Sequence, residues 1–292
     1  MTRRKLSFIQ VIITLFLGLG AVVAIFPFYQ TLMISFSTIN DVGSGRLFLY
    51  PESFNLSSYE YLFLEGKVTR GLLISVVVTV LGTVISLLVT AAGAYALSKK
   101  LLPGRNFVFY AIIFTMFFSG GLIPMYLLLQ SLHMQNNLLV MILPAAVNAF
   151  NLILMKNFFN TVSAELEESA KMDGANDIVI FFRIIIPVSL PIIFTMILFY
   201  AVERWNDWWL PMLFLNDPNL YPLQLVLRNA ISNMNQVINN TVGAQLAAGI
   251  HDIYGDSVKS AMIIISAVPI IMVYPFIQKY FASGIMLGSI KG

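Results

Sequence analysis

The chain has 292 residues, of which 58% are hydrophobic and 11% are charged; its formal net charge is +3 and it contains no cysteine. Because soluble domains carry about 25% charged residues, this composition excludes an ordinary soluble fold and favours a membrane protein. The lack of cysteine excludes disulfides and thiol chemistry, and the two histidines, His133 and His251, form no zinc-binding motif. The slight excess of cations is typical of charges that orient membrane spans rather than of nucleic-acid binding.

Six apolar runs, each long enough to cross a bilayer, follow one another along the chain. Backbone groups inside lipid must be hydrogen-bonded internally, so every run is expected to be helical. The sequence therefore predicts an all-α, polytopic membrane protein with six transmembrane helices in a single transmembrane domain, residues 1–292. The spans are predicted at residues 8–34, 71–98, 106–130, 138–158, 191–215 and 259–282.

The basic residues are divided unevenly between the two ends of these spans. With the N-terminus inside, eleven Lys and Arg residues fall on the cytoplasmic side and five fall outside. Because cytoplasmic loops carry an excess of Lys and Arg, both termini are predicted to be cytoplasmic. Residues 35–70 and 216–258 then form outer loops, and the second is expected to hold an amphipathic helix. No cleavage site follows the first run, which is expected to remain as a span.

Small residues form a stripe along the second predicted span. Such residues let helices approach closely, because helix association in lipid depends on packing rather than on the hydrophobic effect. The stripe can pack against other helices of this chain or against a second membrane subunit, and the sequence favours neither. Its members are Gly82, Ser86, Thr90, Gly93 and Ala94.

The polar segment 159–190 interrupts the apolar runs and is predicted to form two short helices joined by a sharp turn. A helix is expected to start near Ala164, after an N-cap hydroxyl or amide and with glutamates in its first turns. Gly174 can adopt positive φ and end it. Asn176 can cap the next helix, which Pro187 is expected to break. The N-cap candidates are Asn160, Thr161 and Ser163.

This segment also resembles a known motif. The run Glu168-Ser169-Ala170-x-x-Asp173-Gly174-Ala175, then Phe182 and Ile184-x-x-Pro187-x-x-x-Pro191, is similar to the EAA motif of bacterial ABC-importer permeases. It departs from that motif in Ser169, where the first alanine is usual, and in Ile186, where leucine often precedes the proline. The resemblance implies the type I importer (MetI-like) permease fold and a coupling helix that docks on an ATPase subunit. The coupling residues it implies are Glu167, Glu168, Ala170, Asp173, Gly174, Ala175, Phe182 and Pro187.

Other stretches resemble the carbohydrate branch of that family, the maltose-permease-like subunits. These stretches are Trp205-Asn206-Asp207 with Leu210-Pro211-Met212, and the tail Gly288-Ser289-Ile290-Lys291-Gly292. The segment 221–228 is similar to permeases for complex oligosaccharides and alginate. The resemblance implies a bacterial cytoplasmic-membrane permease for oligosaccharides or polysaccharide fragments. It also implies a partner permease, two identical or different ATPase subunits and an extracytoplasmic solute-binding protein.

Charged and polar residues lie near the middle of the fifth predicted span, where a charge costs about 2.5–3.5 kcal/mol on insertion scales. They are expected either to line a substrate path or to pair with one another and fix helix packing. For the two asparagines of the fourth span, polar contacts between helices are the favoured role. The substrate-path candidates are Glu203, Arg204, Trp205, Asn206, Asp207, Asn148 and Asn151.

No phosphate-binding loop of the G-x-x-x-x-G-K-[ST] type occurs, so ATP hydrolysis is expected in a separate chain. ATP and magnesium are expected on the ATPase subunits, and no cofactor or metal on this chain. Transport is then expected to proceed by alternating access. Three alternatives remain: an ABC permease for a non-sugar solute, a membrane-embedded enzyme, and an autonomous transporter. The enzyme would need convergent catalytic groups, and the autonomous transporter would show inverted repeats, of which none is evident.

Overall fold

The computed structural model describes residues 8–38, 50–51, 54–64, 66–232 and 255–286. In this part of the chain the regular elements are all helical and no strand occurs, as the all-α prediction requires. The chain divides into two compact units, residues 1–68 with 227–268 and residues 69–226 with 269–292. The expected outer amphipathic helix falls partly outside the described residues. Its first part is the amphipathic helix α13 (Leu223–Ser232).

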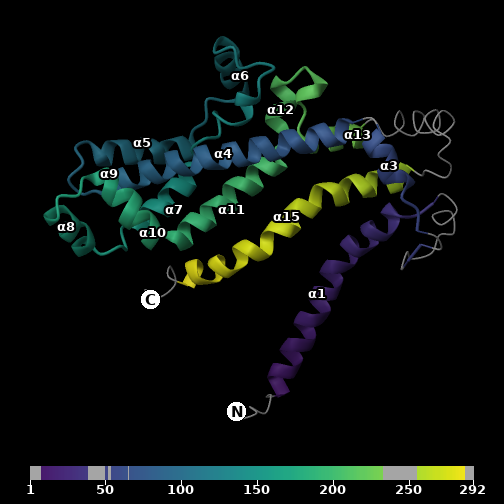
Figure 1. Cartoon of the computed structure of the whole chain (residues 1–292), viewed down its shortest axis with the longest axis horizontal. Helices are drawn as coiled ribbons and strands as arrows, with labels where there is room; N and C mark the ends of the chain where they lie inside the picture. Colours follow the sequence, from purple (N-terminus) through teal and green to yellow (C-terminus); the bar gives the residue numbers. More distant parts are fainter. Residues whose placement is uncertain (1–7, 39–49, 52–53, 65, 233–254, 287–292) are drawn as a thin grey trace. The chain divides into compact units, whose positions relative to one another are not determined.

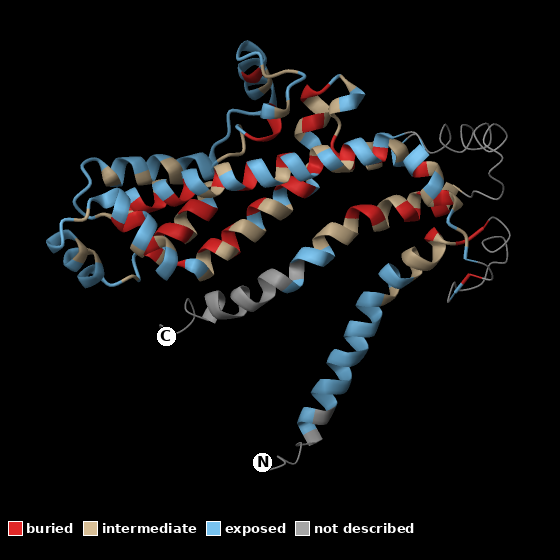
Figure 2. Ribbon diagram, in the orientation of Figure 1, coloured by how far each residue is buried: buried red, intermediate tan, exposed pale blue. Residues whose placement is uncertain are grey.

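The first unit contains α1 (Phe8–Ser35), α3 (Ser57–Leu64) and the first turns of α15 (Gly255–Met286). Most described side chains of α1 before its last turns are exposed, as Figure 2 shows, although the helix is strongly apolar. Polar contacts gather at its C-terminal end: the Ser35 hydroxyl lies 2.8 Å from the Tyr59 hydroxyl, and Ser257 donates to the Ser37 carbonyl at 2.7 Å. An apolar helix that buries so little within its own unit is suited to lipid contact.

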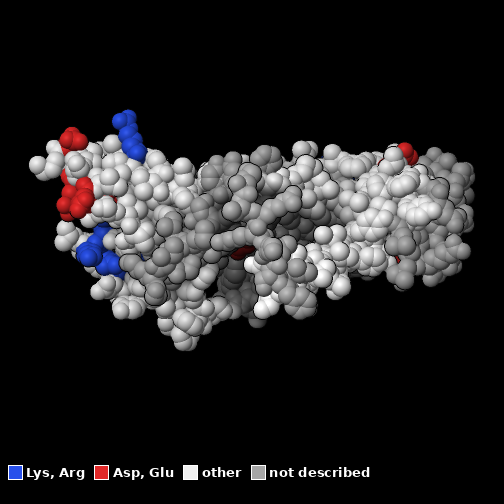
Figure 3. Space-filling model, turned by 90° about the horizontal axis from the view of Figure 1, so that it is seen from below, with Lys and Arg blue, Asp and Glu red and all other residues white. Residues whose placement is uncertain are grey.

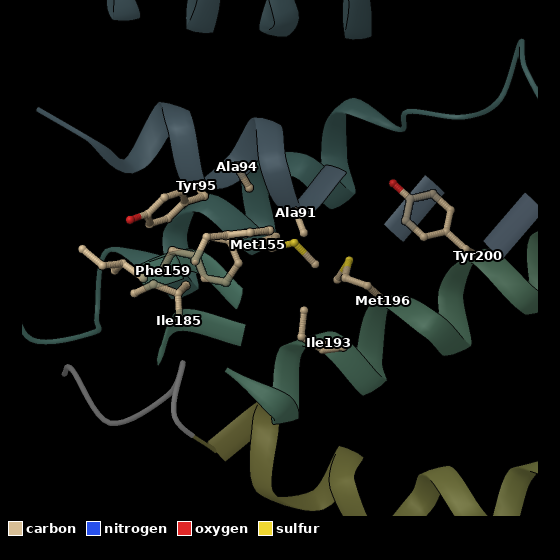
Figure 4. Packing of buried hydrophobic residues seen from close by; sticks show 11 residues of the cluster. Ala91, Ala94, Tyr95, Met155, Phe159, Ile185, Ile193, Met196 and Tyr200 are labelled. Atoms are coloured by element: carbon tan, nitrogen blue, oxygen red, sulfur yellow. The ribbon is translucent and has the colours of Figure 1, made fainter. Parts of the chain in front are cut away.

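The second unit is built on α4 (Lys67–Ser98), α7 (Ala149–Phe159) and α11 (Leu190–Asn206), which lie side by side (Figure 1). Their facing sides form a buried cluster to which α9 and the following π-helix also contribute; Figure 4 shows it from close by. The remaining elements are α5 (Arg105–Phe117), α6 (Leu122–Ser131), η1 (Leu138–Met141), α8 (Ala164–Met172), α9 (Asp177–Ile180), η2 (Phe181–Ile185), α10 (Ile186–Val188), α12 (Trp209–Phe214) and η3 (Pro218–Leu220).

Three of the predicted spans coincide with long apolar helices: α1, α4 and α15. The third is not one straight helix, because α5 and α6 meet at 116° around Gly120 and Gly121. Gly121 has φ of 87°, which ordinary residues avoid. The break there therefore has a backbone cause, and the predicted run 106–130 is a bent pair.

The fourth predicted span, 138–158, is α-helical only from Ala149 onwards. Its first part is the short 3-10 helix η1, followed by irregular chain that contains Pro144. Proline has no N–H to donate and disfavours helix in the residue before it. A fresh helix then begins behind Asn148, whose side chain accepts from the backbone of Phe150. The carbonyls of this irregular stretch must therefore accept hydrogen bonds from other parts of the chain.

The fifth predicted span corresponds to α11 and α12, which are separated at Asp207 and Trp208. Before it, the segment from α9 to α10 meets α11 at 85°. Pro187 does not end the second short helix where it was expected. It is accommodated in the first turn of α10, and the chain turns at Ser189 instead. A π-helical turn over Phe181–Ile185 joins α9 to α10.

Candidate functional site

The first candidate site is the elbow formed by α8 and α9. Of the three N-cap candidates, Ser163 performs the role, because its hydroxyl accepts from the Glu165 backbone at 3.3 Å. The acidic residues of the first turn, Glu165 and Glu167, complement the positive end of the helix dipole. Local sequence therefore accounts for where α8 begins.

The turn after α8 depends on Gly174, whose φ is +82° as predicted. The Gly174 N–H donates to the Lys171 carbonyl at 3.0 Å, and the Ala175 N–H donates to the Ala170 carbonyl at 2.9 Å. These bonds close the C-terminal end of α8. A Cβ at position 174 would meet nothing within 4 Å, so the glycine is required by backbone conformation and not by space. Asn176 then caps α9 by accepting from Val179 at 2.9 Å.

Two ion pairs hold the elbow in place. Lys99, at the end of α4, pairs with Glu167 of α8 and also lies 4.0 Å from the centre of the Tyr95 ring. Lys171 pairs with Asp177 across the turn at 3.1 Å. The hydrogen bond that Lys171 donates to Asp177, and secondarily the charge of Asp177, raise the pKa of Lys171 above its ordinary value. The pair is solvent-exposed, so its stabilising effect is small.

Apolar packing joins the elbow to the membrane helices. Phe181 is buried, with its ring centre 5.1 Å from that of Tyr95 in α4. Ala170 and Ala175 pack against the same cluster, which Tyr95, Phe159 and Ile185 help to form (Figure 4). Through these contacts the elbow packs against residues of α4, α7 and α11.

The outer face of the elbow is exposed and mixes acidic with apolar side chains. Figure 3 shows charged residues gathered at the end of the molecule that holds α8. Met172 is 88% exposed. Of the predicted coupling residues, Glu168, Asp173, Gly174, Phe182 and Pro187 are exposed, whereas Glu167, Ala170 and Ala175 are partly buried. The exposed apolar residues of this face are Leu166, Met172, Ile178 and Phe182.

The second candidate site is the polar cluster of the fifth span, and Arg204 is its centre. The Arg204 side chain is buried, with 5% of the residue exposed. Its guanidinium donates to the carbonyls of Met141, Ile142 (3.1 Å) and Ala145 (2.6 Å), and to the Ser86 hydroxyl at 3.0 Å. Arg204 thus binds the free carbonyls of the irregular stretch before α7. These hydrogen bonds account for the burial of Arg204 without a carboxylate partner or a substrate path.

The stripe of small residues on α4 packs within this chain. A Cβ on Gly82 would lie 3.0 Å from Arg204 Nε and 3.2 Å from its Cδ, so the glycine makes room for the arginine. Further along, the Thr90 and Tyr200 hydroxyls are 2.6 Å apart. These contacts support the first of the two alternatives for the stripe and join α4 to α11.

The other polar candidates are spread over different environments. Asn148 accepts from Phe150 and Asn151 and so caps α7, and its own N–H lies 3.4 Å from the Tyr200 hydroxyl. Asp207 accepts from the backbone of Trp209 and Leu210 at the break before α12. Asn151 is buried, whereas Glu203 and Asn206 are exposed. The structure therefore brings Arg204 and Asn148 to the irregular stretch and leaves Glu203 and Asn206 facing outwards.

Trp205 lies apart from the rest and lines a hollow of about 210 Å³ between α4, α11 and the later part of α15. Apart from Thr79 and the indole of Trp205, the lining is aliphatic. Such a wall offers few of the hydrogen bonds that a carbohydrate requires. Its lining residues are Val76, Thr79, Val80, Leu198, Ala201, Val202, Trp205, Pro269, Ile270 and Val273.

Sequence reasoning missed the partners of Arg204, since they lie 59 to 118 positions away. One local signal was present: Pro144 inside an apolar run predicts unpaired carbonyls that need a donor. Among the described residues, no group of three His, Cys, Asp or Glu side chains could hold a metal ion.

The comparisons with known proteins identify the family. Residues 102–287 match the family described as binding-protein-dependent transport system inner membrane component. The polygalacturonan/rhamnogalacturonan transport system permease protein YtcP of Bacillus subtilis is 42% identical over 95% of this chain and 96% of its own. The chain belongs to this permease family.

Two further likenesses extend over nearly the whole chain. Protein LplC of Bacillus subtilis is 41% identical over 95% of this permease and 93% of its own length. A solved chain of a bacterial ABC transporter involved in the import of the acidic polysaccharide alginate is 35% identical, with a TM-score of 0.88. That match covers 96% of this permease and 99% of the solved chain.

Family membership fixes the general role of the molecule. It is a membrane-embedded transport subunit of an ABC importer and not an enzyme, and ATP hydrolysis belongs to a separate chain. Permeases of this kind act with a partner permease, ATPases and a binding protein. The all-α type I importer fold predicted from the sequence is confirmed.

Proposed function

We propose that this permease imports oligosaccharides or polysaccharide fragments across the bacterial cytoplasmic membrane, with both of its termini in the cytoplasm. The observation that carries the proposal is the full-length likeness to a permease named for polygalacturonan/rhamnogalacturonan and to a solved importer of alginate. The uneven distribution of Lys and Arg supports the orientation.

The complete importer is proposed to contain this chain, a second permease subunit, two ATPase subunits and an extracytoplasmic solute-binding protein. ATP and magnesium are bound by the ATPases and no cofactor by this chain. Closure of the ATPases moves the elbow, and the cavity between the two permeases changes the side on which it opens. The free energy of coupling must come from contacts with the ATPases that differ between their open and closed states.

The elbow is suited to this role because one of its faces is free and the other is fixed. Met172, Ile178 and Phe182 present apolar side chains outwards, where an ATPase subunit can bury them. On the inner face, Phe181 and the Lys99–Glu167 pair tie the elbow to α4. A force on the outer face is therefore transmitted as movement of the whole packed cluster.

The residues proposed to meet substrate are those of the fifth-span cluster that remain exposed, Glu203 and Asn206. Arg204 and Asn148 are proposed to hold the irregular stretch in shape rather than to touch the solute. Asp207 and the backbone it binds fix the break between α11 and α12. Neighbouring positions of α11 are therefore proposed to have different roles. Glu203 and Asn206 contact the solute, and Arg204 supports the irregular stretch.

Uptake by cells that lack the chain tests the function directly. A deletion strain should fail to accumulate labelled fragments of one polysaccharide class, and a plasmid copy should restore uptake. Fragments of polygalacturonan, rhamnogalacturonan and alginate would be compared with a short peptide as the non-sugar control. Restored uptake of the peptide, without uptake of any fragment, would overturn the sugar assignment.

A further inference from the structure

We propose that Arg105 and Lys156 form a binding site for the phosphate of an anionic membrane lipid. Arg105 opens α5, and Lys156 lies in the last turn of α7. Lys156 lies over the ring of Phe109, which follows Arg105 by one helical turn in α5, so the two cations are neighbours. Two like charges held together at a membrane boundary need an anion to offset the repulsion.

No such anion is found in the described part of this chain. The Arg105 Nε donates to the Leu97 carbonyl at 2.9 Å, and no carboxylate meets the rest of its guanidinium among the described residues. Lys156 lies over the Phe109 ring, with its Nζ 4.3 Å from the ring centre, and forms no described ion pair. By contrast, Lys99 and Lys171 are paired with acids.

Both side chains are held in place rather than freely mobile. The Leu97 carbonyl fixes the direction of the Arg105 guanidinium. Lys156 is only 7% exposed, so its aliphatic stem is covered, and the ring of Phe109 positions its ammonium. Ordering of this kind lowers the entropy lost when an anion binds.

The surroundings favour a lipid over a soluble anion. Within its unit α5 has no buried residue, and its exposed side chains include Phe107 and Tyr110. In the preceding turn, Leu101 is 97% exposed. Acyl chains can cover these apolar groups while the headgroup phosphate lies between the two cations. Basic pockets between helices on the cytoplasmic side are known to bind anionic headgroups.

The location agrees with a cytoplasmic-leaflet lipid. The Lys99–Glu167 pair places the turn between α4 and α5 beside the elbow. The assignment of this side to the cytoplasm rests on the proposed function. The phosphate site does not depend on that assignment. Lipid bound there would contact α5 and α7 next to the coupling segment.

Lipid titration of the complete purified importer, followed by native mass spectrometry, tests the site. Phosphatidylglycerol should bind more tightly than phosphatidylcholine. Arg105→Gln and Lys156→Gln should each weaken phosphatidylglycerol binding about fivefold, because each removes one of the two cations that contact the phosphate. Lys100→Gln, which removes an exposed cation from the same turn, is the matched control and should leave binding unchanged.

If Lys156→Gln fails to assemble, Lys156→Met, which keeps the length of the side chain, replaces it in the binding measurement. Unchanged phosphatidylglycerol preference in an assembled double variant would overturn the proposal. Equal binding of inorganic phosphate or glycerol phosphate would replace the lipid with a soluble anion. A carbodiimide crosslink from Lys156 to a partner chain would replace it with a partner carboxylate. Sugar uptake is measured separately, so a failed transport assignment leaves the lipid result intact.

Discussion

The elbow and the Arg204 cluster both lie where a helix stops, but they are stabilised in different ways. At the elbow, the bonds that shape the chain join residues within five positions, as at Ser163 and Ala175. At the cluster, Arg204 reaches carbonyls and a hydroxyl 59 to 118 positions away. Many polar groups of the elbow are exposed. Arg204 is buried, and buried backbone groups must find partners within the protein.

The two regions differ in what their hydrogen bonds hold together. An elbow whose turn is closed by local bonds keeps its own shape while its outer face remains open for a partner. A cluster fixed by distant bonds joins α4, η1 and α11 into one body. In the proposed mechanism, movement received at the elbow is carried to the Arg204 cluster without loss of shape.

The largest effect is expected for Arg204→Met, which leaves three carbonyls without their donor. Each hydrogen bond to a charged group contributes about 1.5–3 kcal/mol, so loss of the set should exceed that range. The variant should lose assembled importer, seen as reduced recovery on size exclusion and a lower Tm. Glu203→Gln, one position earlier and exposed, is the control and should assemble normally. Wild-type Tm in Arg204→Met together with lost uptake would instead place Arg204 in the substrate path.

A smaller loss is expected for Gly82→Ala, because the added Cβ would lie 3.0 Å from Arg204 Nε. Overpacking of this kind costs about 1–3 kcal/mol. The Tm should fall, and the fall should shrink when the change is made in an Arg204→Ala background, since the Cδ and Nε atoms that clash are then absent. Gly18→Ala, whose Cβ meets nothing within 4 Å, is the control. Additive effects of the Gly82 and Arg204 changes would show that the contact does not couple them.

At the elbow, Gly174→Val tests backbone strain without a packing change. The left-handed conformation costs an L-residue about 1–2 kcal/mol, and more for a β-branched one. Membrane insertion should be retained while the ratio of sugar transported to ATP hydrolysed falls. Gly174→Asn is the matched control, because asparagine tolerates this conformation. A valine variant with a normal ratio would remove the argument that this turn shapes the coupling segment.

The smallest effect is expected for Lys171→Met, which removes an exposed ion pair with Asp177. The hydrogen bond and charge of Asp177 raise the pKa of Lys171 in the folded state, so the pair is fully formed below the ordinary lysine pKa and is lost only as pH rises through the raised value. Transport and Tm at neutral pH should be unchanged. A clear loss at neutral pH would show that Lys171 contacts a partner subunit.

The two regions also differ in how far the sequence predicts them. Ser163, Gly174 and Asn176 act through neighbours in the chain, so capping and turn rules located them. The exposed face of α8 followed from its acidic first turn. The turn at Ser189 was harder to predict from the sequence, because a π-helical turn lets Pro187 be accommodated without ending the helix.

The partners of Arg204 could not be predicted, because the sequence marked its charge but not the carbonyls of Met141 and Ala145. Hydropathy merged η1, the irregular stretch and α7 into one apparent span. Hydropathy records apolar content and not backbone pairing, so a break at Pro144 leaves the signal almost unchanged. The bend between α5 and α6 was hidden for the same reason.

The central claim is that the outer face of the elbow meets an ATPase subunit, and crosslinking tests it most directly. Because the chain has no cysteine, a single cysteine at Met172 needs no altered background. In native vesicles that carry the whole importer, a bifunctional thiol–amine reagent should join Met172→Cys to an ATPase subunit, whereas Phe16→Cys on α1 should give no such product. Absence of that product from Met172→Cys in an importer that still transports would contradict the account.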